Sequence, residues 1–195
     1  EEGFEVTGVD ASEAQLAQAR EAGPGPEFVK GDLAALGEAV TGSFGAAISV
    51  GNGLPHLFEG PMASFLAGLA KLLLPGAPVL FQLLNYDRIL DARVTSLPLN
   101  VREDEAERVV FLRLMDPRPD GSVVFNPTTL RWRPGEEPPV EVVTGKNVLL
   151  TGWRRAELEA TLGAAGFRVE EVFGGMRREE WDAAASPDTV VLARR

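Results

Sequence analysis

The stretch FEVTGVDAS, residues 4–12, decides the fold of this chain. Residues 4–9 contain the apolar and β-branched side chains that are typical of a short buried strand. Asp10 follows directly, and Ser12 is a residue type that caps the first turn of a helix. A short strand, an acid and a helix cap in succession predict a strand-to-helix connection in an α/β protein.

The same alternation continues as far as residue 84. We expect further strands at residues 27–30, 44–50 and 78–84, and helices at residues 12–22, 33–40 and 61–74. Residues 44–50 form a continuous apolar run, which predicts a strand that is buried on both faces. Strands and helices in this order predict a Rossmann-like, mostly parallel sheet with helices on both faces.

The pattern changes after residue 84. Residues 109–115, 123–132 and 140–150 predict three antiparallel strands, with a hairpin turn at Asp120-Gly121. A helix at residues 153–165 and strands at residues 167–173 and 189–193 follow. We therefore assign residues 1–98 and 151–195 to one core, with an antiparallel last strand, and residues 99–150 to a small antiparallel β insert that covers the substrate.

Composition excludes several classes of function. The chain has 195 residues, a net charge of −10, no cysteine and one histidine. The absence of cysteine excludes disulfide frameworks and thiol catalysis and suits the reducing cytoplasm. A strongly acidic balance argues against nucleic acid as a partner, and no apolar run has the length of a membrane span. One histidine among scattered acids gives no spacing for a metal site, so we predict no metal.

Polar residues stand where the predicted strands end. These positions are Asp10, Asp32, Gly51-Asn52-Gly53 and Asn85-Tyr86-Asp87. Ligands of open parallel sheets bind outside the carboxyl ends of the strands. The two oxygens of a carboxylate match the two hydroxyls of a ribose, so Asp10 is a candidate ribose ligand. A capping role for Asp10, favoured by the helix dipole, explains the same residue equally well.

The order of these strand ends resembles the class I S-adenosylmethionine-dependent methyltransferases. The segments VTGVDAS, VKGDL and AAISVGNGLPHL fall on the positions where that family binds ribose, adenine and methionine. The segment AGF and the two final strands resemble the family's closing reversed hairpin. The resemblance implies S-adenosylmethionine as the cofactor and a small-molecule methyl acceptor, and a homodimer is compatible with it.

A narrower resemblance is to the glycine and sarcosine N-methyltransferases, through VGNGLPHL at residues 50–57 and NYD at residues 85–87. It implies that Asn85 and Tyr86 orient the substrate. It places Val50, Gly51, Asn52, Gly53 and His56 at the cofactor. The wider family resemblance adds Asp10 and Asp32, with their neighbours Ala11 and Leu33. In that group an arginine that pairs with the amino-acid carboxylate precedes NYD, whereas here Leu84 precedes it, which argues against glycine as the substrate. Asp87 and Arg88 fit a solvated pair.

The family's glycine-rich loop has no counterpart in this chain. That loop should lie about 20 residues before Asp10, and only nine residues precede this aspartate. We therefore expect that an N-terminal segment with the first strand is not included here, which would leave a sheet edge unpaired.

Two other functions remain open at this point. An acid after the second strand serves NAD equally well, so the chain could be a fragment of an NAD-binding oxidoreductase. The missing glycine-rich loop instead favours a methyltransferase-like module that binds but does not catalyse. The expected function is transfer of a methyl group from S-adenosylmethionine to a nitrogen or oxygen nucleophile.

Overall fold

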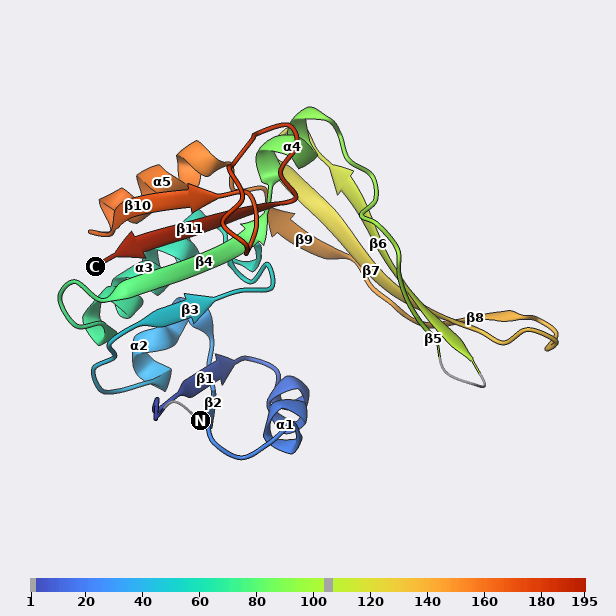
Figure 1. Ribbon diagram of the computed structural model, residues 1–195, viewed down its shortest axis with the longest axis horizontal. Coiled ribbons are helices and arrows are strands. Elements are labelled where there is room, and N and C mark those ends of the chain that lie inside the picture. Colours follow the sequence, from blue (N-terminus) through green and yellow to red (C-terminus); the bar gives the residue numbers. More distant parts are fainter. Residues whose placement is uncertain (1–2, 104–106) are drawn as a thin grey trace.

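Two sheets and a layer of helices make up the core of the computed structural model, which describes residues 3–103 and 107–195 (Figure 1). The order of its elements to residue 91 is β1 (Thr7–Asp10), α1 (Glu13–Glu21), β2 (Glu27–Lys30), η1 (Leu33–Ala35), α2 (Leu36–Ala39), β3 (Ala47–Ser49), η2 (Leu54–His56), α3 (Glu59–Leu72), β4 (Pro78–Leu84) and α4 (Tyr86–Asp91). The insert contains β5 (Asn100–Glu103), β6 (Arg108–Pro117), β7 (Ser122–Trp132), β8 (Val140–Gly145) and β9 (Val148–Thr151). The chain returns to the core with α5 (Arg155–Ala164), β10 (Arg168–Phe173) and β11 (Asp188–Arg194). Residues 104–106 of the predicted insert and residues 1–2 of the predicted core lie outside the described part.

The strands of the core divide into two hydrogen-bonded sheets. β1 and β2 form a parallel pair, and a second sheet has the order β10-β11-β4-β3. In this second sheet β3 is parallel to β4, whereas β11 is antiparallel to both of its neighbours. The mixed α/β fold and the antiparallel last strand are confirmed. A single, mostly parallel sheet is not what the described strands form, because none of them bridges β1 and β3.

One face of β3 is open. Ile48 is 71% exposed and Val50 is 51% exposed. β3 is paired with β4, and none of the described strands pairs with its other edge. The prediction that this strand is buried on both faces is therefore wrong, because the described residues do not supply the cover that such burial needs.

Exposure of Ile48 leads to a stability prediction. We expect Ile48→Ser to change the free energy of unfolding by no more than about 0.5 kcal/mol, since the substitution removes little buried surface. Leu83→Ala is the control, because Leu83 is fully buried on β4 and its truncation should cost about 2–5 kcal/mol. Equilibrium denaturation measures both values. A cost for Ile48→Ser as large as that of Leu83→Ala would mean that this face is covered in solution.

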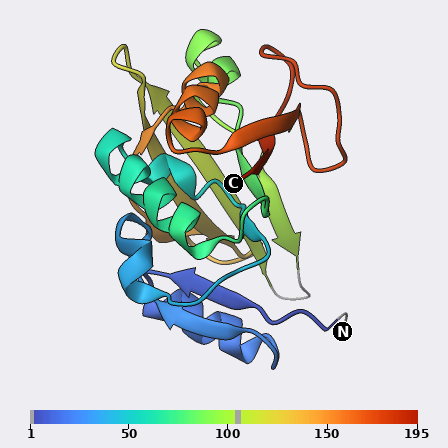
Figure 2. The same cartoon turned by 90° about the vertical axis from the view of Figure 1, so that its left-hand side faces the viewer.

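Helices α3 and α5 pack against one face of the four-stranded sheet. Val79, Phe81 and Leu83 alternate along β4 and belong to one buried cluster with Leu66 of α3 and Leu158 of α5. This alternation follows from the period of two in a strand. In Figure 2 the helices α2, α3 and α5 lie on the same side of the sheet.

The insert is a long antiparallel arm. β6 and β7 pair along their full length and reach away from the core, with β5 and β8 at the far end (Figure 1). The run predicted as one strand at residues 140–150 is broken into β8 and β9, both of which pair with β7. Met115 and Val123, near the base of the arm, belong to the buried cluster of the core. The arm is therefore anchored in the same core as the sheet.

Candidate functional site

The carboxyl ends of the parallel strands lie at one side of the molecule, where the arrows of β1, β3 and β4 point the same way (Figure 1). Asp10 is paired in register with Lys30, and the backbone N–H of Gly31 donates to the carbonyl of Asp10 at 3.1 Å. Asp32 follows immediately, so both aspartates lie at the carboxyl end of the parallel β1–β2 pair, and both are exposed. An edge that carries two exposed carboxylates favours a ligand with several hydroxyl or amino donors.

Each aspartate uses one oxygen locally: Asp32 caps η1, whereas Asp10 closes the turn that leads into α1, which Ser12 caps. Oδ1 of Asp10 accepts from the backbone N–H of Ser12 at 2.7 Å, and Oδ1 of Asp32 accepts from Ala34 at 2.9 Å. No described residue donates to Oδ2 of either carboxylate. The interpretation of Asp10 as the cap of α1 is wrong, because Ser12 holds that position. The second oxygen of each acid remains available to a ligand. Ala11, next to Asp10, is exposed and Leu33, next to Asp32, is half-buried.

The turn after β3 is fixed to the end of β4. Gly51 and Asn52 have positive φ angles of 79° and 64°. The Gly51 N–H donates to Oε1 of Gln82 at 2.7 Å, and Oδ1 of Asn52 accepts from the N–H of Leu84 at 3.0 Å. A Cβ atom built on Gly51 would meet nothing within 4 Å, so the space beside this backbone is open to a ligand. Gly53 precedes η2 and is half-buried, while Val50 is exposed.

His56 lies in η2, beside the base of the insert. The residue as a whole is exposed, but partial burial of its imidazole, together with the charge of Lys146, lowers the pKa of this ring. Leu57, the next residue, accepts a hydrogen bond from Nε1 of Trp153 at 3.1 Å. The loop predicted to hold the cofactor is thus held against the segment that follows the insert, and a neutral His56 can act as donor or acceptor there.

The two predicted substrate residues are both fully buried. Oδ1 of Asn85 caps α4 by accepting from the N–H of Arg88, and its Nδ2 donates at 3.1 Å to the carbonyls of Asp182, Ala183 and Ser186. The hydroxyl of Tyr86 lies 3.2 Å from Nδ2 of Asn52, and burial raises the pKa of this phenol. These contacts favour a positioning role for both residues; a direct contact with substrate stays a prediction.

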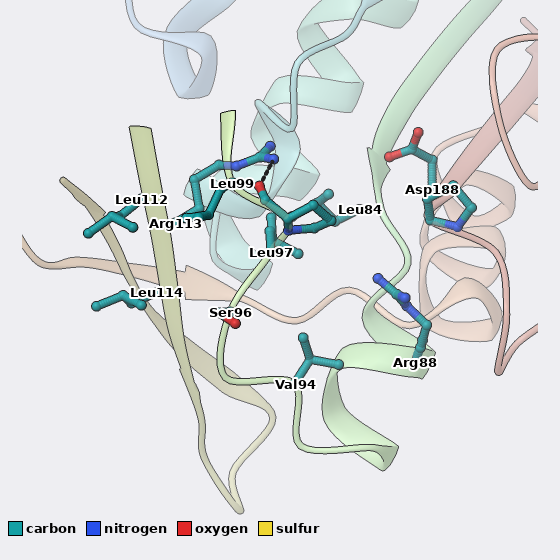
Figure 3. Close-up of a pocket in the computed structure, with 12 residues that line it drawn as sticks. Leu84, Arg88, Val94, Ser96, Leu97, Leu99, Leu112, Arg113, Leu114 and Asp188 are labelled. Carbon is teal, nitrogen blue, oxygen red and sulfur yellow. Dashed lines mark hydrogen bonds between the residues drawn. The ribbon is translucent and has the colours of Figure 1, made fainter. Parts of the chain in front are cut away.

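A cavity of about 840 Å³ opens between the end of β4 and the base of the insert (Figure 3). Most of its wall is apolar, and it is formed by Leu84, Val94, Leu97, Pro98, Leu99, Leu112, Leu114 and Pro187. Its polar residues are Arg88, Ser96, Arg113 and Asp188. A largely apolar cavity with a few convergent polar groups is the usual form of a small-molecule site.

Sequence reasoning missed Arg88, Asp188 and Gln82. Arg88 was assigned to a solvated pair with Asp87, but the Asp87 carboxylate instead contacts Arg154 and the N–H of Arg155. Nε2 of Gln82 donates to Oδ1 of Asp188 at 3.0 Å, so Gln82 joins the cavity to the turn at Gly51. The position of Asp188 at the carboxyl edge was hidden because its strand runs antiparallel to β4 and begins at that edge.

Comparison with known proteins finds likenesses to methyltransferases. Residues 1–76 match the family described as a methyltransferase domain. No curated protein sequence matches the chain. Among solved structures, the fold is similar to that of the SAM-bound amino pentose methyltransferase CalS10 from Micromonospora echinaspora, with a TM-score of 0.74 and 19% identity, covering 98% of this chain and 74% of that one.

Two further structures have the same fold. An S-adenosylmethionine-dependent methyltransferase from Clostridium acetobutylicum gives a TM-score of 0.76 at 13% identity and covers 98% of this chain and 75% of that one. The CcbJ methyltransferase from Streptomyces caelestis gives 0.73 at 21% identity and covers 98% and 80%. At these identities the likeness establishes the fold, and together with the matched domain it supports S-adenosylmethionine as the cofactor.

Two other expectations concern metals and membranes. Within residues 3–103 and 107–195, no group of three or more histidines and acids gathers as a metal site. Over the same residues, no helix combines the length and apolar character needed to cross a membrane.

Proposed function

We propose that the protein transfers a methyl group from S-adenosylmethionine to a nitrogen or oxygen atom of a small molecule. The observation that carries this proposal is the edge at which Asp10 and Asp32 each keep one carboxylate oxygen free, within a fold shared with methyltransferases. The match of residues 1–76 to a methyltransferase domain supports it independently.

The residues at this edge fit the parts of the cofactor. The free oxygen of Asp10 would accept from the ribose hydroxyls, and Asp32 with Leu33 would hold the adenine. The open backbone of Gly51 and Asn52, with Val50, Gly53 and His56, would lie along the rest of the molecule. When bound, the cofactor supplies an electrophilic methyl group on a sulfonium.

The protein's own part would be alignment. Holding two reactants in line contributes about 7–11 kcal/mol through effective molarity. Tyr86 stays protonated because burial raises its pKa, so its hydroxyl would position the turn through Asn52 rather than remove a proton.

We propose further that residues 99–150 cover the methyl acceptor, because Leu112, Arg113 and Leu114 of this insert form one wall of the cavity.

Titration with two ligands tests the proposed function. We expect S-adenosylhomocysteine to bind saturably and NAD not to bind, as measured by isothermal titration calorimetry. Binding of NAD alone would favour an oxidoreductase fragment and refute methyl transfer.

A methyl-transfer assay then separates an enzyme from a binding module. Incubation with S-adenosylmethionine carrying a labelled methyl group and a pool of small amines should yield a labelled product. Saturable binding of S-adenosylhomocysteine with no labelled product from any amine or alcohol pool would favour a module that binds without catalysis.

A further inference from the structure

The cavity beside the insert holds two opposite charges that do not pair with each other. Arg88 projects from α4 and Asp188 from the start of β11, and both lie on the side of the cavity opposite the leucines of β6 (Figure 3). The positive charge of Arg88 is close enough to favour the ionised form of Asp188. Nevertheless, no ion pair within 4.0 Å joins either side chain to a described residue. Opposite charges held apart in an apolar cavity are each left partly unsatisfied.

Arg88 is the less satisfied of the two. Its Nε atom is buried and has no hydrogen-bond partner among the described residues. Nε of Arg113, the other arginine of the cavity, is also buried without a partner, but Nη2 of Arg113 donates to the carbonyl of Pro98 at 3.0 Å. No hydrogen bond or ion pair joins the Arg88 guanidinium to any described residue. A buried polar group without a partner destabilises the folded protein, and more so when it is charged. An anionic partner would therefore bind to Arg88 in preference to Arg113.

Asp188 is held in place but keeps accepting capacity. Gln82 donates to its Oδ1, and no described residue donates to Oδ2. The same Gln82 accepts from the N–H of Gly51, so the carboxylate is connected by one side chain to the turn expected at the cofactor. A donor group of a molecule in the cavity that reaches Oδ2 would consequently lie close to that turn.

We propose that this cavity binds a methyl acceptor that carries an oxyanion, held by Arg88, and an N–H or O–H nucleophile, oriented by Asp188. The apolar wall would contact the body of the molecule, and a volume of about 840 Å³ suits a small organic compound. The oxyanion is a carboxylate or a phosphate, since both match a guanidinium. That the bound molecule accepts a methyl group rests on the proposed function, whereas binding of its charged groups does not depend on methyl transfer.

Probes with a common phenyl body test the two charges separately. The probes are 3-phenylpropionate, phenyl phosphate and phenethylamine, and calorimetry measures their affinity for the full chain. We expect Arg88→Met to weaken binding of the anions at least about tenfold, which is about 1.4 kcal/mol, and to leave phenethylamine unaffected. Asp188→Asn should weaken binding of phenethylamine to a similar extent and leave the two anions unaffected. Tighter binding of phenyl phosphate than of 3-phenylpropionate would identify a phosphate as the oxyanion, and the opposite order a carboxylate.

Matched variants separate binding from folding. Arg88→Lys keeps the charge and should retain much of the anion affinity, while Arg177→Met removes an exposed arginine outside the cavity and should have no effect. Equal anion affinity in the wild type and in Arg88→Met would overturn the inference, as would no saturation by either anion at about 1 mM.

A parallel titration with S-adenosylhomocysteine keeps the two proposals apart. Failure of the wild type to bind it would contradict the proposed function and leave the anion result standing. Retained S-adenosylhomocysteine binding with anion affinity that Arg88→Met does not change would contradict only this inference.

Discussion

Asp10→Ala is expected to weaken binding of S-adenosylhomocysteine at least about tenfold, which corresponds to about 1.4 kcal/mol. The carboxylate uses one oxygen for the N–H of Ser12, and its second oxygen is free for the ribose hydroxyls. Charge-assisted hydrogen bonds of this kind contribute about 1.5–3 kcal/mol each. Calorimetric titration of the purified variant measures the change directly.

Loss of the turn that leads into α1 is the competing explanation for a weaker variant, and Asp10→Asn separates the two. An asparagine side chain can still accept from Ser12, so it should keep the start of α1 while removing the charge and one acceptor oxygen. We expect Asp10→Asn to have the thermal stability of the wild type and the weak binding of Asp10→Ala. Wild-type affinity in both variants would remove Asp10 from the site.

The local pattern was sufficient to predict most of the core. β4 occupies residues 78–84 as expected. Its ends were predictable because Pro75-Gly76 precedes the apolar run and Asn85 follows it. β2 also lies where it was predicted. β3 is shorter than residues 44–50, because Phe44 forms only an isolated bridge with Leu73 before the regular pairing to β4 begins.

Elements that depend on distant partners were missed. α4 has only six residues, too few for an apolar period, and Asn85 was assigned to the substrate although it is a good helix cap. β5 is exposed along its whole length and is defined by its pairing with β6 rather than by its own residues. The break between β8 and β9 likewise follows from how each packs on β7.

The residues of the candidate site likewise fall into two groups, those predictable from the local pattern and those that depend on distant parts of the chain. Asp10, Asp32 and the turn at Gly51-Asn52 were predictable because a parallel pair brings successive strand ends to one edge. Arg88 and Asp188 were not, because 100 residues separate them and the turn of α4 brings one of them toward the start of β11. Sequence spacing carries no information about such a pair.

Asn85→Ala is expected to lower the free energy of unfolding by about 3 kcal/mol. The buried amide donates to three carbonyls of the 182–186 loop, of which that of Ser186 is buried, and its oxygen caps α4. Its removal leaves this buried acceptor unpaired, at about 1–3 kcal/mol, and an uncapped helix, at about 1 kcal/mol. At about 2–4 °C per kcal/mol for a chain of this size, the melting temperature should fall by roughly 6–12 °C. Circular dichroism on heating measures this shift, and Asn100→Ala, on the exposed strand β5, should be neutral.

The same variant decides between the two roles of Asn85. If the side chain only positions its neighbours, Asn85→Asp should be destabilised as well, because a carboxylate can cap α4 but cannot donate to the three carbonyls. If it mainly contacts substrate, both variants should unfold at the wild-type temperature and lose methyl transfer alone. The hydrogen bonds at 3.1 Å to the 182–186 loop lead us to expect destabilisation, since this loop runs directly into Pro187 and Asp188 of the cavity wall. Asn85 would then act on the site through the placement of Asp188.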